Sequence, residues 1–394
     1  METTRRDFVA GTAAAGIALA AAGATSALAE EAAAADETAE TTEAEGDGYS
    51  VVETESGLQV TIADDENPDL PTVVVLATGG TIAGVGDAGK TTNYQAGQLD
   101  VGTLVASAAG ITDIANVRGV QVCNVGSDDI TDAYWIQIAE TINELAADDA
   151  VSGFAITHGT DTLDETAYFL TLAVKTDKPV VITGAMRPST ATSADGPMNL
   201  YETIACAASE DSRGRGCLVV FSDGIYSGRD VQKVNTFKTD AFSGRDKGCL
   251  GYMLDGAPQY YNATTRNHTL DTEFDVTDLD ALPSVAVAYF NIDADPGVLN
   301  YYVENGAKGI VIAGAGAGCY SGLWNDAVKG LADTGIPVIR CSRIGNGLIT
   351  QDDYFEGNVI LGGDLAPQKA VVLLRLALTV TTDLDEIAEM FKTY

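Results

Sequence analysis

Two segments place hydroxyl side chains and glycines directly after apolar runs, where a nucleophile could be displayed. In the first, Thr78-Gly79-Gly80-Thr81 follows a β-branched run that ends at Ala77. Paired glycines permit a sharp turn and a close approach to a ligand, and they leave Thr81 at the end of the predicted strand. Thr81 is then either a nucleophile or a cap for the next segment, and the local pattern alone favours the cap.

The second segment, Thr157-His158-Gly159-Thr160-Asp161-Thr162, follows another apolar run. Its hydroxyls and carboxylate could hold a polar substrate, and the helix predicted from Asp164 would present its N-terminal N–H groups to an anion. The alternative is a helix-capping cluster. His158 is interpreted as a structural hydrogen-bonding residue.

A lysine offers the base that a threonine nucleophile needs. The chain has only two histidines, so a lysine near a carboxylate is the natural substitute. Lys233, in Gly228-Arg229-Asp230-Val231-Gln232-Lys233, is the candidate, although on its own it would be interpreted as a surface charge.

Glycine-rich stretches elsewhere give weaker signals. Gly84-Val85-Gly86-Asp87-Ala88-Gly89 matches a dinucleotide fingerprint formally, but it does not lie between a strand and a helix, so we reject that site. Glycines around Tyr94 instead favour a lid that closes over a ligand. The glycines at 314, 316 and 318 favour a close-packed turn.

The remaining pattern predicts the elements that must position these side chains. Continuous apolar runs are typical of parallel strands buried on both faces, and strands that alternate with helices predict βαβ units. We expect an α/β fold, with a larger N-terminal parallel-sheet domain flanked by helices and a smaller C-terminal α/β domain. The predicted strands are 72–77, 153–157, 179–183, 217–221, 284–290, 309–313 and 338–341, and the predicted helices are 132–147, 164–174, 199–208, 299–305, 325–334, 368–379 and 384–391.

The N-terminus reads as a targeting segment. Arg5-Arg6 precedes an alanine-rich apolar run from Val9 to Leu28, which ends in Ala27-Leu28-Ala29. These are marks of a bacterial twin-arginine export signal, cleaved after Ala29. The alternative is a membrane anchor, since the run is about long enough to span. We therefore expect an exported protein, periplasmic or secreted, with no membrane association after cleavage.

Composition limits both the domain plan and the partners. The predicted division is a signal peptide at 1–29, an acidic disordered linker at 30–48, an extension carrying an extra strand at 49–69, the first α/β domain at 70–262, a linker at 263–283 and the second domain at 284–394. The net charge of −35 argues against a nucleic-acid partner. Six cysteines without a CxxC pair predict mostly buried free thiols, with a Cys206–Cys217 disulfide as an alternative, and no metal site.

Taken together, the motifs resemble the bacterial type II L-asparaginase family, the exported asparaginase–glutaminase branch. The resemblance runs from about Leu70 to Tyr394 and is carried by Ala77–Ala83, His158–Thr162, Gly184–Thr190, Gly228–Asn235 and Pro367–Lys369. It implies hydrolysis of the side-chain amide of L-asparagine, and often L-glutamine, to the acid and ammonia, without a metal or cofactor. It also implies a homotetramer, a dimer of dimers with active sites at subunit interfaces.

The same resemblance implies roles for individual residues. Thr81 is expected to be the nucleophile of an acyl transfer, with Tyr94 in the lid assisting it. Thr160, Asp161 and Lys233 are expected to form a second cluster, in which Lys233 helps to activate a hydroxyl or water. Asp161 would also accept the α-ammonium of the substrate, and the Thr160 N–H would face the developing oxyanion.

Substrate binding is where this chain departs from the family. Ser127 and Ala185 are expected beside the substrate carboxylate and amide, but Asp128 stands where many relatives carry glutamine. An acid supplied by the neighbouring subunit has no clear match, and Glu356 or Asp353 are the candidates. The resemblance therefore leaves open a glutamine-preferring glutaminase-asparaginase. It also leaves open an ammonia-supplying amidotransferase subunit, which the export signal disfavours, and a non-catalytic periplasmic amino-acid-binding protein on the same scaffold.

Overall fold

The computed structural model describes residues 49–54, 56–63, 65–86, 90, 94–98, 101–355 and 357–394. The predicted signal peptide at 1–29 and the acidic linker at 30–48 lie outside the described residues.

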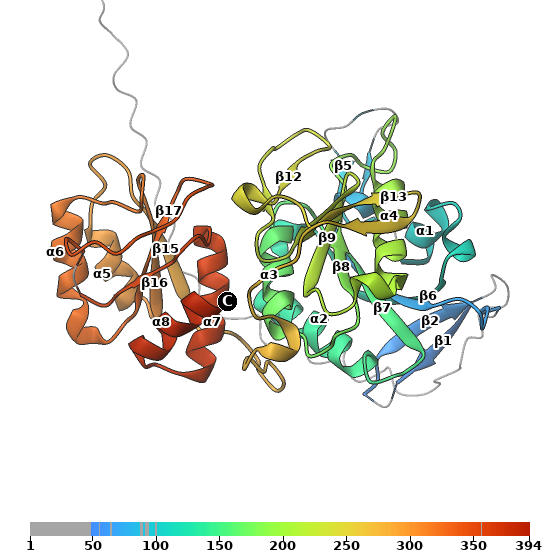
Figure 1. Ribbon diagram of the computed structural model, residues 1–394, viewed down its shortest axis with the longest axis horizontal. Helices are drawn as coiled ribbons and strands as arrows, with labels where there is room; N and C mark the ends of the chain where they lie inside the picture. Colours follow the sequence, from blue (N-terminus) through green and yellow to red (C-terminus); the bar gives the residue numbers. More distant parts are fainter. Residues whose placement is uncertain are drawn as a thin grey trace, which may run out of the picture. The chain divides into compact units, whose positions relative to one another are not determined.

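Among the described residues, ten strands form one large mixed sheet (Figure 1). Its strands in spatial order are β1 (Tyr49–Glu53), β2 (Gln59–Ala63), β6 (Asn116–Val125), β3 (Thr72–Gly79), β7 (Val151–Thr157), β8 (Val180–Thr183), β9 (Cys217–Phe221), β10 (Gly224–Ser227), β13 (Gly251–Leu254) and β14 (Ala257–Tyr260). The five central strands, from β6 to β9, are parallel. This confirms the predicted α/β class and the parallel core of the sheet.

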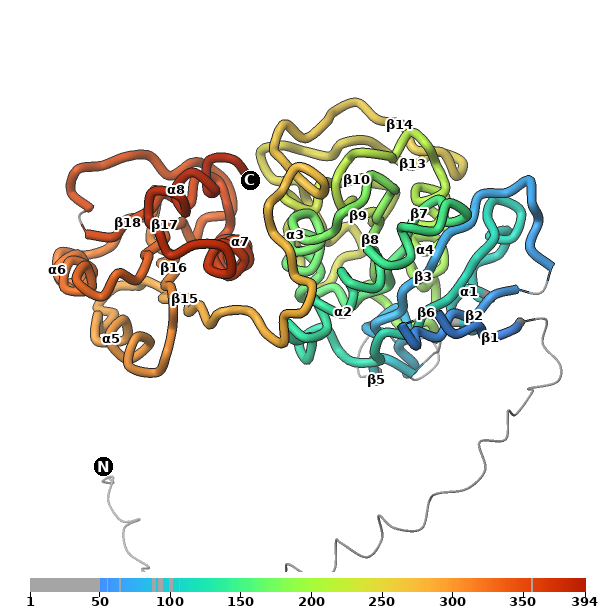
Figure 2. The backbone as a smooth tube through the Cα atoms, turned by 90° about the horizontal axis from the view of Figure 1, so that it is seen from below, coloured from blue at the N-terminus to red at the C-terminus, as the bar shows by residue number. Residues whose placement is uncertain are grey.

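The two edges of this sheet are antiparallel, which the sequence pattern did not indicate. β10, β13 and β14 continue the sheet beyond β9. Tight turns join β9 to β10 and β13 to β14, whereas the long 228–250 segment lies between β10 and β13. At the other edge, the extension contributes two strands rather than the single one expected: β1 and β2 form a hairpin, and β2 pairs antiparallel with β6 (Figure 2). Short connections allow antiparallel pairing, whereas parallel strands need a long crossover.

Helices cover both faces of the large sheet. Alternate residues of β3 point to opposite faces, as the two-residue period of a strand requires. Val73 and Val75 pack in a cluster with helices α1 (Val101–Ser107) and α4 (Gly196–Ala208), whereas Val74 and Leu76 pack with α2 (Asp132–Leu145) and α3 (Leu163–Ala173). Burial on both faces explains why the β3 sequence is a continuous apolar run.

The C-terminal part of the chain forms a smaller, wholly parallel sheet. Its order is β15 (Val285–Tyr289), β16 (Gly309–Gly314), β17 (Val338–Ser342) and β18 (Val359–Leu361). The strands pack with α5 (Gly297–Glu304) and α6 (Gly322–Gly330) on one face and with α7 (Pro367–Val380) and α8 (Leu384–Thr393) on the other. Helix α7 also packs against α3, which joins the apolar cores of the two sheets.

The segment between the two sheets is more apolar in its contacts than its sequence suggests. Phe274, Val276 and Leu282 are buried in the same cluster as α3 and α7. The Phe274 ring lies 5.1 Å from that of Tyr394. We propose that residues 263–283 form the inter-domain linker, which these buried side chains hold in place.

All six cysteines are free thiols. Cys206, Cys217 and Cys341 are buried, and the alternative Cys206–Cys217 disulfide does not form. The cysteines are unpaired as expected, but only half of them are buried: Cys123 and Cys249 are partly exposed and Cys319 is exposed.

A buried acid on α4 gives the protein a predictable pH dependence. The side chain of Glu202 is only 6% exposed, and burial together with the neighbouring Asp223 carboxyl group raises the pKa of Glu202 from 4.5 to about 8. Between pH 4.5 and about pH 8, Glu202 holds a proton in the folded chain that it has released in the unfolded chain. The contribution of Glu202 to stability therefore falls as the pH rises through this range.

Glu202→Gln is accordingly expected to raise the free energy of unfolding by about 1–3 kcal/mol at pH 7, because the amide needs no proton uptake. Thermal unfolding between pH 5 and pH 8 checks this, with the exposed Glu140→Gln on α2 as the control. A Glu202→Gln variant whose stability follows that of the parent at both pH values would show that this carboxyl group titrates normally.

Candidate active site

The tips of β3 and β7 lie side by side and bring the two threonine motifs together. The strands are paired in parallel, with Ala77 opposite Thr157. Beyond the strand ends, the backbones touch: a Cβ placed on Gly80 would lie 2.4 Å from the backbone nitrogen of Gly159. Thr81 follows Gly80 as the first residue of a 3₁₀ turn and is 8% exposed. Only glycine allows this approach, so the pair of glycines positions Thr81 next to the second motif.

Gly80→Ala is therefore expected to separate the two motifs. The alanine would meet the Gly159 backbone and adopt a φ of 78°, at a cost of about 2 kcal/mol or more. For the amide hydrolysis that the resemblance implies, we expect kcat for ammonia release to fall by a factor of about 10², because the two motifs are displaced from each other. Gly335→Ala is the matched control, since Gly335 has a φ of 71° with open space around it. Equal activity of the two variants would contradict this role for Gly80.

Lys233 joins the second motif through two short hydrogen bonds. Its Nζ donates to Thr160 Oγ1 at 2.7 Å and to Asp161 Oδ1 at 2.6 Å. The lysine lies on the two-residue strand β11 (Gln232–Lys233), which pairs with β12 (Phe242–Ser243). The Lys233 side chain is 15% exposed, whereas that of Asp161 is 72% exposed. The arrangement places an ammonium against a buried hydroxyl and leaves the carboxylate accessible to a ligand.

Ser127 and Ala185 lie next to the same motif. Ser127 Oγ accepts a hydrogen bond from the Asp161 N–H at 3.2 Å, and its hydroxyl packs against Gly159. Ala185 is fully buried directly after Gly184, and a Cβ on Gly184 would lie 3.0 Å from Thr160 Cγ2. Five predicted site residues are thus gathered around one backbone segment: Ser127, Thr160, Asp161, Ala185 and Lys233.

His158 is fully buried and has both ring nitrogens paired. Nδ1 lies 2.7 Å from the carbonyl oxygen of Gly159, which can only accept, so Nδ1 carries the proton. Nε2 accepts from the Thr166 hydroxyl at 3.0 Å, and that hydroxyl accepts from the Trp135 indole at 2.8 Å. Burial lowers the pKa of His158 to about 4, so the ring is neutral at physiological pH. This network confirms a structural role for His158.

Other predicted residues are not placed with this group. The Tyr94 side chain and Glu356 lie outside the described parts of the structure, as do residues 87–89 and 91–93 of the predicted lid. Asp128 is exposed, with its carboxylate beside Gly126. Asp353 is exposed next to Tyr354, whose carbonyl accepts from Asn325 on α6. Within the described contacts of one chain, Asp353 bonds to none of the gathered residues.

Two supporting residues were missed by the sequence analysis. Asp195 accepts hydrogen bonds from the N–H groups of Met186 and Arg187, both at 2.9 Å, and so fixes the loop after Ala185. Asn199 donates to the Gly184 carbonyl at 3.0 Å. An acid just before the Gly196-Pro197 helix start was the available signal, because helix starts favour side chains that bind backbone N–H groups.

Within the ranges given above, no group of three or more His, Cys, Asp or Glu side chains is arranged to hold a metal ion.

Two protein-family models match the sequence over most of the described chain. Residues 72–266 match the model "Asparaginase, N-terminal", and residues 284–391 match "Glutaminase/Asparaginase C-terminal domain". The chain belongs to the asparaginase family. It is an amidohydrolase, as the sequence motifs predicted.

Individual relatives share this extent. L-asparaginase 2 of Bacillus subtilis is 46% identical over 84% of this chain and 88% of its own length. A probable periplasmic L-asparaginase of Haemophilus influenzae is 42% identical over 86% of this chain and 97% of its own. The crystal structure of a probable cytoplasmic L-asparaginase from Campylobacter jejuni superimposes with a TM-score of 0.80 at 43% identity, covering 82% of this chain and all of that one.

The names of these relatives place them in two different compartments, the periplasm and the cytoplasm. In the part of the chain that the structure describes, no helix is both long enough and apolar enough to cross a bilayer.

Proposed function

We propose that this amidohydrolase converts L-asparagine to L-aspartate and ammonia through a threonine nucleophile and an acyl-enzyme. The observation that carries the proposal is the Lys233 ammonium, bonded to Thr160 and Asp161 beside the strand tip that bears Thr81. The names of the relatives support asparagine as the substrate.

In the proposed first half-reaction, the Thr81 hydroxyl oxygen attacks the side-chain amide carbon, and its proton, with Tyr94 assisting, passes to the leaving nitrogen. A tetrahedral oxyanion forms and is stabilised by backbone N–H groups, that of Thr160 among them. The C–N bond then breaks, and the nitrogen, which has taken up the proton from Thr81, leaves as ammonia. The product is an ester between the acyl group and Thr81.

In the proposed second half-reaction, water cleaves this ester and regenerates the threonine. Lys233 and Thr160 are placed to pass protons, because Thr160 Oγ1 accepts from the lysine and keeps its own hydrogen for donation. The Asp161 carboxylate holds the ammonium in place through its 2.6 Å bond.

Substrate recognition follows from the charges on either side of this cluster. We propose that Asp161, whose side chain is largely exposed, accepts the α-ammonium of the amino acid. The buried Ser127 hydroxyl accepts from the Asp161 N–H and retains a proton to donate to the α-carboxylate. Asp128, exposed next to Ser127, adds a negative charge that opposes that carboxylate.

The length of the substrate side chain bears on the choice between L-asparagine and L-glutamine. We expect kcat/KM for L-asparagine to exceed that for L-glutamine by about tenfold or more, because the longer substrate moves its reacting amide away from groups fixed by the α-carboxylate and α-ammonium. Coupled ammonia assays with both substrates check this. A higher kcat/KM for L-glutamine would make the protein a glutaminase-asparaginase.

Assembly and export complete the proposal. We propose that the chain is exported by the twin-arginine route to the periplasm or beyond, and that it works as a homotetramer, a dimer of dimers. A neighbouring copy would then supply Asp353 or Glu356 to the site. Arg5-Arg6 and the apolar run after them support export, and the exposure of Asp353 supports its contact with another copy.

A further inference from the structure

The position of Lys233 depends on the turn that precedes its strand. Gly228 and Arg229 connect β10 to β11, and Lys233 lies four residues beyond Arg229. The strand β11 has only two residues, so its pairing with β12 gives limited support. The turn itself lies against α3: a Cβ on Gly228 would come within 2.6 Å of Thr171 Oγ1 and 2.7 Å of the Ala167 carbonyl oxygen. Any displacement of the turn therefore moves Lys233 relative to Thr160.

A buried lysine from the C-terminal part of the chain holds this turn. Lys369, on the first turn of α7, is 1% exposed, and its Nζ donates to the carbonyl oxygens of Gly228 at 2.6 Å and Arg229 at 2.9 Å. The ammonium also lies 5.6 Å from the centre of the Tyr168 ring. Burial lowers the pKa of Lys369 to about 8, although Asp164 and Asp230 oppose the shift. Burying a cation is costly, so its contacts must offset that cost.

The residues next to Lys369 in sequence contact both the start of α3, near Asp161, and the turn before Lys233. Gln368 Nε2 donates to Asp164 Oδ2 at 3.1 Å, and Asp164 lies three residues after Asp161. Asp364 binds the Arg229 guanidinium at 2.7 Å and Lys247 at 3.1 Å. These partners hold the pKa of the Asp364 carboxyl group well below its usual range, even though burial opposes the shift.

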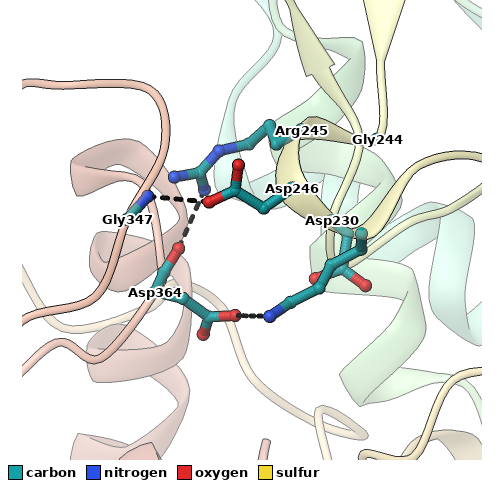
Figure 3. Close-up of a pocket in the computed structure, with 7 residues that line it drawn as sticks. Asp230, Gly244, Arg245, Asp246, Gly347 and Asp364 are labelled. Atoms are coloured by element: carbon teal, nitrogen blue, oxygen red, sulfur yellow. Dashed lines mark hydrogen bonds and ion pairs between the residues drawn. The ribbon is translucent and has the colours of Figure 1, made fainter.

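Figure 3 shows the residues around Asp364, where the segment 364–369 lies next to the residues that follow β10. The Asp364 carbonyl oxygen accepts from Arg245 at 2.8 Å, and the Gly347 N–H donates to Asp246 at 2.9 Å. The segment 364–369 thus connects the turn before Lys233 to the start of α3, next to Thr160 and Asp161. It does so across more than 130 residues of sequence.

We propose that Lys369 is a positioning residue: by holding the Gly228 and Arg229 carbonyls, it keeps Lys233 Nζ within hydrogen-bond reach of Thr160 Oγ1. The inference rests on the proposed function of Lys233. Lys369 Nζ donates to the two carbonyl oxygens of the turn, and we propose that it acts only through this turn.

Lys369→Met tests this, because methionine has a similar length and no donor. We expect kcat for L-asparagine to fall by a factor of about 10–10², with KM changed by less than about threefold, since a displacement of 1 Å is enough to impair catalysis. Arg375→Met is the matched control. Arg375 lies two turns further along α7, binding Asp132 at 2.5 Å and the Pro283 carbonyl at 3.0 Å, away from the turn. Its loss is expected to lower stability and leave kcat within about twofold of the parent value.

A second variant covers the case in which Lys369→Met does not fold. Lys369→Gln has no charge to bury and keeps an N–H donor, but its nitrogen ends one bond short of the lysine position. We expect a folded protein with the same type of kcat loss. A folded Lys369→Met or Lys369→Gln with the parent kcat overturns the proposal, as does an equal kcat loss in Arg375→Met.

A double-mutant cycle separates positioning from general destabilisation. In a Lys233→Met background, Lys369→Met should lower the residual kcat by less than about twofold, because the group that it positions is already absent. An undiminished effect in that background means that Lys369 does not act through Lys233. If the parent releases no ammonia, or if Lys233→Met is fully active, the proposed function fails instead, so the two failures are distinguishable.

Discussion

Replacing Thr81 by alanine is expected to lower kcat for ammonia release from L-asparagine by a factor of about 10³–10⁴. The alanine removes the hydroxyl that we propose to attack the amide, while the surrounding backbone is unchanged. The Gly80–Gly159 contact is made by main-chain atoms and does not depend on the threonine side chain. Thermal unfolding close to that of the parent would show that the loss is chemical.

Thr81→Ser is the matched control for this variant. Serine keeps the hydroxyl and removes only a methyl group, so we expect measurable turnover, well above that of Thr81→Ala. In the parent, protein quenched during turnover should carry the acyl group of asparagine on the peptide that contains Thr81. Full activity of Thr81→Ala, or an acyl group attached elsewhere, would assign the nucleophile to another residue.

Replacing Lys233 by methionine is expected to lower kcat by a factor of about 10²–10³, within the range of a lost proton-transfer group. Thr160 Oγ1 would lose the donor at 2.7 Å, and the exposed Asp161 carboxylate would lose its ion pair. Because Asp161 is proposed to bind the substrate ammonium, its freed carboxylate should keep KM within about tenfold of the parent value.

Lys238→Met is the control for this second variant, because Lys238 is exposed in the loop that follows the same strand. It changes the net charge by the same amount and should leave kcat unaltered. If Lys233→Met retained the parent kcat, another group would have to donate to Thr160 Oγ1, and the proposed proton path would be wrong.

The central strands could be predicted from the sequence because they are buried on both faces. β3, β7 and β9 read as continuous β-branched runs for that reason. β6 did not, since its sequence mixes valines with Arg118, Gln121 and Asn124, and several of its residues are partly exposed. The short edge strands β10, β13 and β14 have three, two and one buried positions respectively, too few for a clear period.

The site residues that lie within the sequence motifs could be predicted, because the fold brings these motifs together. Thr160, Asp161 and Lys233 come from two motifs, and the structure places them within hydrogen-bond distance. The residues that hold these motifs could not be predicted in the same way. Lys369 meets Gly228 across 141 positions, and a lysine in an amphipathic helix normally indicates a solvent-exposed face. Its burial follows only from the packing of α7 against α3.

We propose that the paired strand tips and Lys233 together hydrolyse an amino-acid side-chain amide. The most direct test of this proposal is to incubate the purified chain with L-asparagine and to measure ammonia and L-aspartate together. We predict saturable release of both products in equal amounts. Thermal stabilisation by L-asparagine with neither product formed would contradict the claim and would make the protein a binding protein on an asparaginase scaffold.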